Sequence, residues 1–349
     1  MNRRSAAIIT AFVLLLALVL VAWQVPAPFA RYSPGPTIDI LATQTDGKPI
    51  VEVSGHKTYK TDGQLRMTTV STTTRDTSPT LLEALAAWVD PDVDLYPYDV
   101  IFPDPGTVEE DREASREEMV DSRHAAVAAA LAELGYQLVQ VSGLVENGAA
   151  KGILRKGDLI TKVNGTKVYT GVQVAEIISA LTPGDSVSIE VERAGERRTV
   201  DIVTKAADDD PERAVVGVFL GVVPELPVTV DVRIPEAIGG PSAGLIFSLA
   251  IYDTMTPGAL TGGTRIAGTG TIANDGSVGP IGGIRQKIAG AEEDGAELFL
   301  VPAENCDEAL LVDTDMRLVR ADTMHDAVEA LEDFVADPDA ALPACGEVS

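Results

Sequence analysis

An uncharged apolar run near the start of the chain constrains its fold more than any other feature. No charged side chain occurs from Ala6 to Trp23, and Arg3 and Arg4 precede this run. A helix of this length reaches about 27 Å, close to the hydrocarbon thickness of a bilayer. The run therefore predicts an N-terminal transmembrane helix within residues 1–24.

The two arginines also predict an orientation. Basic residues beside a membrane span stay in the cytoplasm, so the rest of the chain is expected outside it. A cleaved signal peptide is the alternative, and it needs a shorter apolar core and small residues before the cut. A cut after Ala30 would place Pro28 at the third position back. We therefore expect a retained, single-pass anchor in the cytoplasmic membrane.

The charge of the chain excludes one class of function. The formal net charge is −26 at pH 7, whereas nucleic-acid binding needs clustered Lys and Arg. We expect no nucleic-acid partner, and we interpret the charge as a solvated surface rather than an acidic recognition patch. The sequence has no metal-ligand spacing and no Gly-x-x-x-x-Gly-Lys-Ser/Thr phosphate loop. Neither a metal nor a cofactor is therefore expected.

Two cysteines, Cys306 and Cys345, are present in the chain. An extracytoplasmic location permits a disulfide bond, which would hold the C-terminal tail against the last domain. Two unrelated thiols are the alternative, and a pair of cysteines alone does not exclude it.

The succession of predicted strands and helices indicates an α+β fold with several units. Strands alternate with helices in the last part of the chain, as in a layered domain, and the Asp- and Pro-rich stretch 90–105 predicts a loop. The expected units are a cytoplasmic tip and anchor (1–24), a linker (25–37), a membrane-proximal part (38–135), a compact mainly-β unit (136–205), a strand–helix domain (206–341) and a tail (342–349).

Short blocks in the compact unit carry a recognisable pattern. They are Leu134-Gly135-Tyr136, Gly148-Ala149-Ala150, the stretch from Leu154 to Ile160, and Val163-Asn164-Gly165. The pattern resembles a bacterial PDZ domain, which implies peptide binding by addition of a strand. A peptide end would pair beside residues 137–141, and the backbone amides of Leu134, Gly135 and Tyr136 would hold its carboxylate. A small β domain that only spaces other parts is the alternative.

Ser242 stands where a serine could act as a nucleophile. It follows Gly239-Gly240-Pro241 at the predicted start of a helix. Glycines such as Gly240 let a substrate backbone approach, and the free amides of a helix start could stabilise an oxyanion. An ordinary helix N-terminus is the alternative, and this hexapeptide alone favours that alternative.

Lys287 favours a nucleophilic role for Ser242 over an ordinary helix N-terminus, because it is the only lysine from residue 206 to the end of the chain. It shares a predicted helix face with Ile284, Ile288 and Ala291. Burial there would lower the pKa of its amine, and a neutral amine can take the proton of a serine. Snorkelling of the ammonium into water is the alternative. A Ser-His-Asp triad is less attractive, since His325 is the only histidine after residue 205.

Four further blocks surround these two residues. They are Gly240-Pro241-Ser242-Ala243-Gly244, Gly268-Thr269-Gly270, the stretch 278–287 and the stretch 299–305. In this order they are similar to the proteolytic domain of Lon proteases. The resemblance implies a catalytic pair of Ser242 and Lys287, with Thr269 as a supporting hydroxyl.

The resemblance extends upstream and has departures. Residues 63–70 and 117–134 resemble an early strand and the first long helix of the Lon-type domain, which implies that the PDZ-like unit is inserted into it. Gly239 and Thr271 stand where the family usually has acidic residues. The spacing from Ser242 to Lys287 is slightly longer than is usual in the family, and a loop at 258–263 would absorb the extra residues. Because Lon-type subunits form rings, the resemblance also implies that a homo-oligomer is possible.

The leading hypothesis is a membrane-anchored, ATP-independent serine endopeptidase that cleaves unfolded or membrane-proximal polypeptides. The PDZ-like unit would select substrate ends. The alternative is a catalytically silent, membrane-anchored adaptor that binds peptide C-termini.

Overall fold

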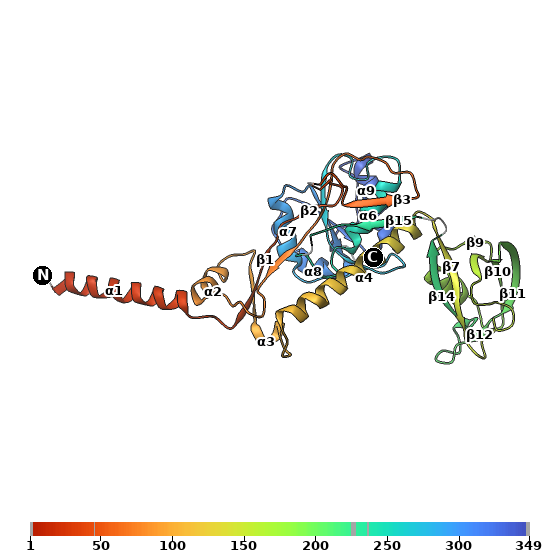
Figure 1. Cartoon of the computed structure of the whole chain (residues 1–349), viewed down its shortest axis with the longest axis horizontal. Coiled ribbons are helices and arrows are strands. Elements are labelled where there is room, and N and C mark those ends of the chain that lie inside the picture. The colour runs from red at the N-terminus through yellow and green to blue at the C-terminus, as the bar shows by residue number, and fades with distance from the viewer. Residues whose placement is uncertain (1–2, 45, 225–227, 236, 347–349) are drawn as a thin grey trace.

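The computed structural model describes residues 3–44, 46–224, 228–235 and 237–346. An apolar helix lies at one end, a layered body in the middle and a small β unit at the other end (Figure 1). Helix α1 comprises Arg3–Gln24. Its window Ala7–Gln24 is long and apolar enough to cross a membrane, and the rest of the protein buries none of it. Length and composition alone thus support a membrane anchor.

A five-stranded sheet forms the middle layer of the body, in the order β2-β4-β16-β19-β20. β4, β16, β19 and β20 run parallel, and β2 runs antiparallel to β4. The strands are β2 (Ile38–Asp39), β4 (Gln64–Met67), β16 (Arg265–Gly268), β19 (Leu298–Pro302) and β20 (Arg317–Ala321). Since β4 pairs with β16, segments before and after the small β unit build one sheet.

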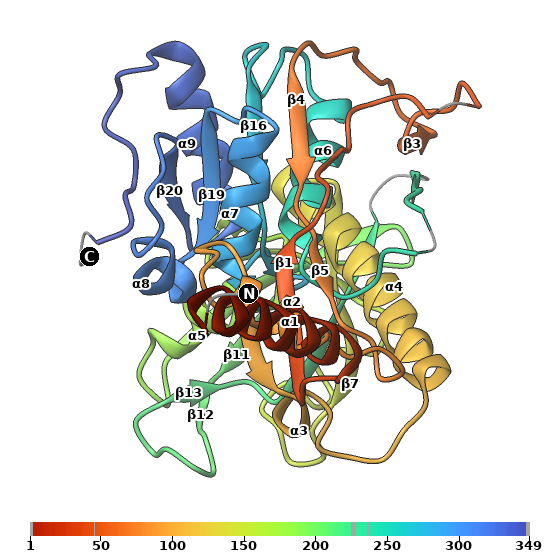
Figure 2. The same ribbon diagram turned by 90° about the vertical axis from the view of Figure 1, so that its left-hand side faces the viewer.

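Successive side chains of β19 point to opposite faces of this sheet, and they are buried on both faces. Leu298 and Leu300 pack with helices α6 (Gly244–Met255) and α9 (Met324–Ala336). Phe299 and Val301 pack with α7 (Ile284–Glu293) and α8 (Cys306–Ala309) on the opposite face. Figure 2 shows the parallel strands side by side between these helices. The result is a three-layer α+β domain, as the alternation of strands and helices predicts.

Helix α6 lies at the centre of the body. Leu245, Phe247 and Ile251 are fully buried, as expected for a helix that is apolar on nearly every side. The long helix α4 (Val108–Glu133) packs against it and begins with a capping box, in which Thr107 and Glu110 satisfy each other's backbone amides.

A three-stranded antiparallel sheet connects α1 to the body. It contains β5 (Val70–Thr72), β1 (Phe29–Pro34) and β6 (Asp94–Pro97). Two short helices, α2 (Leu81–Ala87) and α3 (Tyr98–Ile101), accompany it. The predicted loop at 90–105 is therefore partly wrong. Its strand forms by pairing with β1, which is distant in sequence, and composition reports only local preferences.

The small β unit has a sheet in the order β11-β10-β8-β7-β14, covered by helix α5 (Gly171–Ser179). Its strands are β7 (Gln137–Leu144), β8 (Leu159–Val163), β9 (Thr166–Lys167), β10 (Ser186–Arg193), β11 (Glu196–Val203) and β14 (Val218–Pro224). Because β14 pairs with β7, this sheet extends past residue 205, where the unit was expected to end.

The remaining elements are short. They are β3 (Val51–Ser54) paired with β15 (Thr229–Val232), β12 (Lys205–Ala206) paired with β13 (Ala214–Val215), β17 (Thr271–Ile272) paired with β18 (Val278–Gly279), and the 3-10 turn η1 (Ala303–Asn305).

Cys306 and Cys345 form a disulfide bond in the structure. Both cysteines are buried, and an isolated bridge pairs Val319 of β20 with Ala344 next to the second cysteine. These contacts hold residues 344 and 345 against the α8 side of the sheet.

Candidate active site

Helix α4 holds the loop that carries Ser242. The backbone N–H of Gly240 donates to the carbonyl of Ser115 over 3.0 Å. The hydroxyl of Ser122 donates to the carbonyl of Pro241 over 3.0 Å. A Cβ at Gly239 would lie 2.7 Å from the Cβ of Ser115, so no side chain fits there. Gly239, which departs from the acidic residue usual in Lon proteases, thus fits the close approach of this loop to α4.

Lys287 meets Ser242 in the interior of the body. Its Nζ lies 2.6 Å from Oγ of Ser242 and 3.0 Å from Oγ1 of Thr269. Only 3% of the lysine is exposed, and this burial lowers the pKa of the amine to about 7. Among the described residues no carboxylate forms an ion pair with it. Desolvation therefore shifts the pKa without an opposing charge.

Thr269 completes a closed set of polar contacts around these side chains. Its Oγ1 donates to the carbonyl of Ser242 over 2.9 Å, and the N–H of Gly270 donates to the same carbonyl over 2.9 Å. Thr269 itself is buried. The backbone of the serine is thus fixed from the side of β16 while its hydroxyl faces the lysine.

The start of α6 leaves backbone donors near the serine hydroxyl. Within the described part of the chain, no group accepts a hydrogen bond from the N–H of Ser242 or of Ala243. Gly244 and Leu245, the next two residues, do have partners. Unpaired amides at a helix N-terminus are a ready site for negative charge.

Asp94, in the three-stranded sheet β5-β1-β6, holds α7 in place, and sequence reasoning missed it. Its carboxylate accepts from Nη1 of Arg285 over 3.1 Å and from Nε2 of Gln286 over 2.8 Å. Arg285 also donates to the carbonyl of Pro91 over 2.8 Å. Both side chains immediately precede Lys287. No local sequence pattern predicts this contact, because Asp94 lies in the stretch 90–105, which was expected to form a loop.

His325 does not join the Ser242–Lys287 centre. Its imidazole lies 2.8 Å from Glu133 and 3.4 Å from Glu329. The hydrogen bond to Glu133 raises the pKa of His325.

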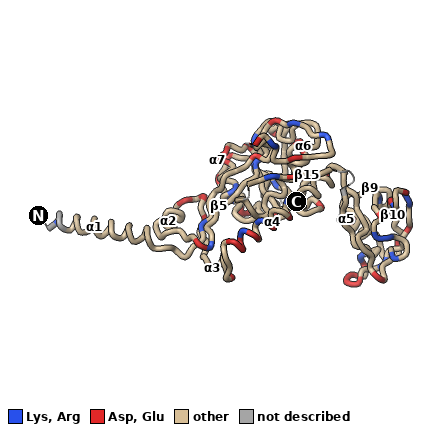
Figure 3. The backbone as a smooth tube through the Cα atoms, in the orientation of Figure 1, with Lys and Arg blue, Asp and Glu red and all other residues tan. Residues whose placement is uncertain are grey.

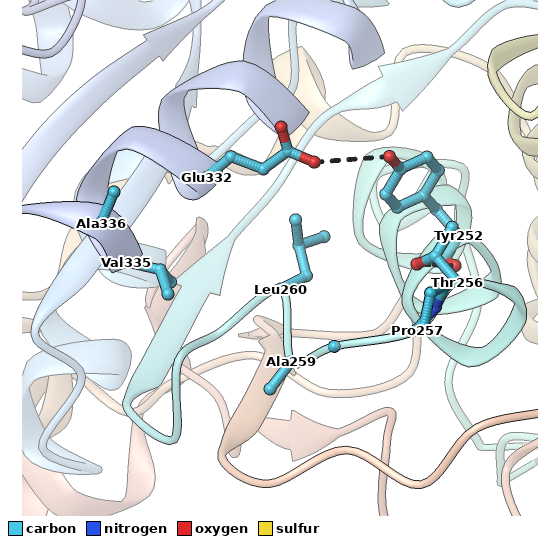
Figure 4. Close-up of a pocket in the computed structure, with 9 residues that line it drawn as sticks. Tyr252, Thr256, Pro257, Ala259, Leu260, Glu332, Val335 and Ala336 are labelled. Atoms are coloured by element: carbon cyan, nitrogen blue, oxygen red, sulfur yellow. Dashed lines mark hydrogen bonds between the residues drawn. The ribbon is translucent and has the colours of Figure 1, made fainter.

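A surface pocket of about 430 Å³ lies elsewhere on the body. It is lined by the C-terminal end of α6, the following loop and α9, where Tyr252 bonds to Glu332 (Figure 4). The loop 258–263, expected to absorb extra sequence, forms part of its wall. Ser242 precedes the opposite end of α6, so this pocket is separate from the Ser242–Lys287 centre.

The expected peptide site at Leu134, Gly135 and Tyr136 is wrong. Their backbone N–H groups already donate to the carbonyls of Ala130, Ala132 and Leu131, which end α4. In addition, β7 is paired with β8 on one side and with β14 along its whole length on the other. Neither the amides nor the strand edge is free for a peptide.

Comparison with known proteins identifies a domain family for two segments of the chain. Residues 227–335 match the Lon protease (S16) C-terminal proteolytic domain, and residues 130–204 match the PDZ domain. The chain contains a Lon-type proteolytic domain and a PDZ domain. The Lon protease of Campylobacter concisus is 28% identical over 203 residues, which is 55% of this chain and 24% of that protein. The peroxisomal Lon protease homolog 2 of Caenorhabditis elegans is 35% identical over 98 residues, or 27% of this chain and 12% of that protein.

Other similarities concern the PDZ domain. A probable periplasmic DegP-like serine endoprotease of Pseudomonas putida is 35% identical over 71 residues, or 20% of this chain and 15% of that protein. A solved PDZ domain of an SdrC-like protein from Listeria monocytogenes is 24% identical with a TM-score of 0.22, covering 24% of this chain and 85% of that one. The chain spans about a quarter or less of the length of these curated relatives.

Proposed function

We propose that this chain is an ATP-independent serine endopeptidase that cleaves unfolded or membrane-proximal polypeptides. The observation that carries the proposal is the 2.6 Å contact between Oγ of Ser242 and Nζ of a buried lysine. Ser242 is the nucleophile, Lys287 the general base and then acid, and Thr269 a supporting hydroxyl.

In the first half of the reaction Ser242 is acylated. Neutral Lys287 accepts the hydroxyl proton while the oxygen of Ser242 bonds to the scissile carbonyl carbon. When the carbon–nitrogen bond breaks, the lysine ammonium protonates the leaving amine. In the second half a water gives its proton to Lys287 and attacks the ester carbon. The carbon–oxygen bond to Ser242 then breaks, and the proton returns to the serine.

The unpaired amides of Ser242 and Ala243 are suited to bind the oxyanion of each tetrahedral intermediate. Removing one such donor typically costs about 10²- to 10³-fold in rate. The glycine at position 240 has a φ of +87° with open space where a Cβ would stand. That space lets a substrate backbone approach the hydroxyl.

We propose that α1 holds the enzyme in the cytoplasmic membrane, with the catalytic body outside the cytoplasm. The basic residues before the span and the disulfide bond of Cys306 and Cys345 both support this orientation. Outside the cytoplasm ATP is absent, so the enzyme would act on polypeptides that need no ATP-driven unfolding, such as unfolded or membrane-proximal segments. The association of several copies stays a prediction from the Lon resemblance.

The PDZ domain offers a different strand edge for substrate ends from the one expected. β14 lies at the end of its sheet, and α5 contacts both β13 and β14. Leu220 of β14 approaches Gly171 at the start of α5. Within the described residues, no group accepts from the backbone N–H of Val216 or Gly217 before this strand. We assign peptide binding to the β14 edge, with these amides available for a carboxylate.

A peptidase assay without ATP tests the proposal. The full chain, reconstituted in lipid nanodiscs, should cleave an unfolded fluorogenic polypeptide, and added ATP should not change the rate. The Ser242→Ala variant should bind the same polypeptide and leave it intact. If the unmodified chain binds but never cleaves, the alternative of a silent PDZ adaptor replaces the enzyme.

A further inference from the structure

Helix α2 presents its large apolar side chains outward and its small ones inward. Ala84 and Ala87 are buried, whereas larger side chains of the helix and of the two residues after it are exposed and form what we call its outward face: Leu81, Leu82, Leu85, Trp88 and Val89. The last two are 81% and 82% exposed. A helix on the surface of a soluble domain does the reverse and buries its large apolar face. This outward face of α2 is therefore an interaction surface.

The start of α2 is tied to the end of α1. The N–H of Leu81 donates to the carbonyl of Val25 over 2.9 Å, and the N–H of Ala27 donates to that of Pro79 over 2.8 Å. The two helices also contact each other directly, and Figure 1 shows α2 beside the inner end of α1. The outward face of α2 thus continues the apolar surface of α1 where that helix leaves the proposed membrane.

The charges around α2 select the chemistry of the partner. No Lys or Arg occurs between Arg75 and Arg112. Helix α1 beyond its first turn likewise carries no charged residue (Figure 3). Glu83, the one acidic residue of α2, accepts the backbone N–H of Thr80 in the capping box, and Arg31 of β1 acts on its charge. The exposed carboxylates of Asp90 and Asp92 follow soon after Val89. A partner held by anionic headgroups would need a cluster of basic residues, which one arginine beside these carboxylates does not supply, so attraction must come from the apolar side chains.

We infer that α2 lies in the membrane–water interface, with its outward face among the lipid headgroups and upper acyl chains. Trp88 suits this position, because indole rings favour the boundary between lipid and water. The inference rests on the proposed anchoring by α1. It gives the catalytic body a second contact with the bilayer, which limits rotation about the anchor. The same segment continues through Pro91 to Asp94, whose carboxylate bonds to Arg285 and Gln286 of α7, so α2 is linked to the helix that carries Lys287.

The two tryptophans of the chain, Trp23 and Trp88, allow a direct test. Trp23→Phe leaves Trp88 as the single reporter, and Trp88→Phe leaves Trp23. Each variant is reconstituted as the full chain in nanodiscs of zwitterionic lipid with brominated acyl chains. Emission from Trp88 should be shifted to the blue and should lose most of its intensity to the bromine. The same chain in nanodiscs of unbrominated lipid gives the reference.

Matched substitutions identify the responsible surface. In the Trp23→Phe background, Leu85→Glu should restore most of the quenched Trp88 emission. Val203→Glu changes a side chain of similar exposure (61%, against 55% for Leu85) on β11 of the PDZ domain, and should restore none. Both positions are exposed, so peptidase activity on a short soluble peptide should persist and report intact folding.

The possible outcomes distinguish a failure of the inference about α2 from a failure of the proposed α1 anchor. If Trp23 is quenched while Trp88 emits as a water-exposed indole, α1 spans the bilayer and the inference about α2 is wrong. If neither is quenched, the anchor fails and the inference with it. A blue-shifted Trp88 that bromine does not quench would indicate that a second copy of the chain covers α2, which also overturns the inference.

Discussion

The Ser242–Lys287 centre and the proposed peptide-binding edge of the PDZ domain depend on different kinds of chemical group. At the centre three side chains, those of Ser242, Thr269 and Lys287, converge in a buried space. At the proposed PDZ site the binding groups are backbone amides and the free side of the edge strand β14, so binding depends mainly on the backbone rather than on residue identity.

This difference decides how each site can be recognised and how each can be damaged. A site made of side chains requires particular residue types, so a few short sequence blocks locate it and one substitution removes its function. A backbone site depends on which strand remains at the sheet edge. That strand is set by pairing between distant segments, and a single substitution only weakens it. The experiments below test this contrast, beginning with the largest expected effect.

Removing either member of the side-chain pair should abolish activity. Ser242→Ala and Lys287→Met should each lower the rate constant kcat for an unfolded polypeptide by on the order of 10⁴-fold. Lys287→Arg should be equally inactive, because guanidinium keeps its proton and cannot act as a base. Melting curves of the variants provide the folding control. Cleavage by either variant at a tenth of the normal rate would remove that residue from the mechanism.

Displacing the serine loop should have the next largest effect. Gly239→Ala would bring a Cβ to 2.7 Å from Cβ of Ser115, so the loop must move. A shift of this kind near a nucleophile can cost about 10²-fold in kcat. The double variant Ser115→Gly with Gly239→Ala should recover part of the rate. Equal rates for the single and double variants would show that this contact does not position Ser242.

A substitution at the PDZ edge should act more mildly and on binding alone. Leu220→Glu puts a charge beside the start of α5 and should weaken affinity for a peptide C-terminus by about tenfold or more. Fluorescence anisotropy with a labelled peptide measures this change. Cleavage of a short peptide should stay unchanged. Tyr136→Ala, at the site first expected, should leave peptide affinity as it was. The opposite pattern for these two variants would restore the original assignment.

The sequence predicts the Lon-type and PDZ domains and the α+β class, because short blocks and alternating strands and helices are local signals. It also predicts that Ser242, Thr269 and Lys287 lie together, and the structure brings them together. Their catalytic roles stay a proposal. Two features needed distant contacts that no local pattern encodes. They are the strand at Asp94 and the pairing of β14 with β7. The amides of Leu134 to Tyr136 are used by local bonds that end α4, which the resemblance to a peptide-binding loop did not take into account.

The central claim is that Lys287 is a neutral base at working pH, and the pH dependence of kcat/KM tests it most directly. The folded-state pKa is lowered from 10.5 to about 7, so the neutral, active fraction rises as pH increases through about 7. Activity at pH 6 should be about a tenth of the plateau reached above pH 8. A rate that is flat from pH 5 to 9, or one that first rises near the ordinary lysine pKa of about 10.4, would contradict the account.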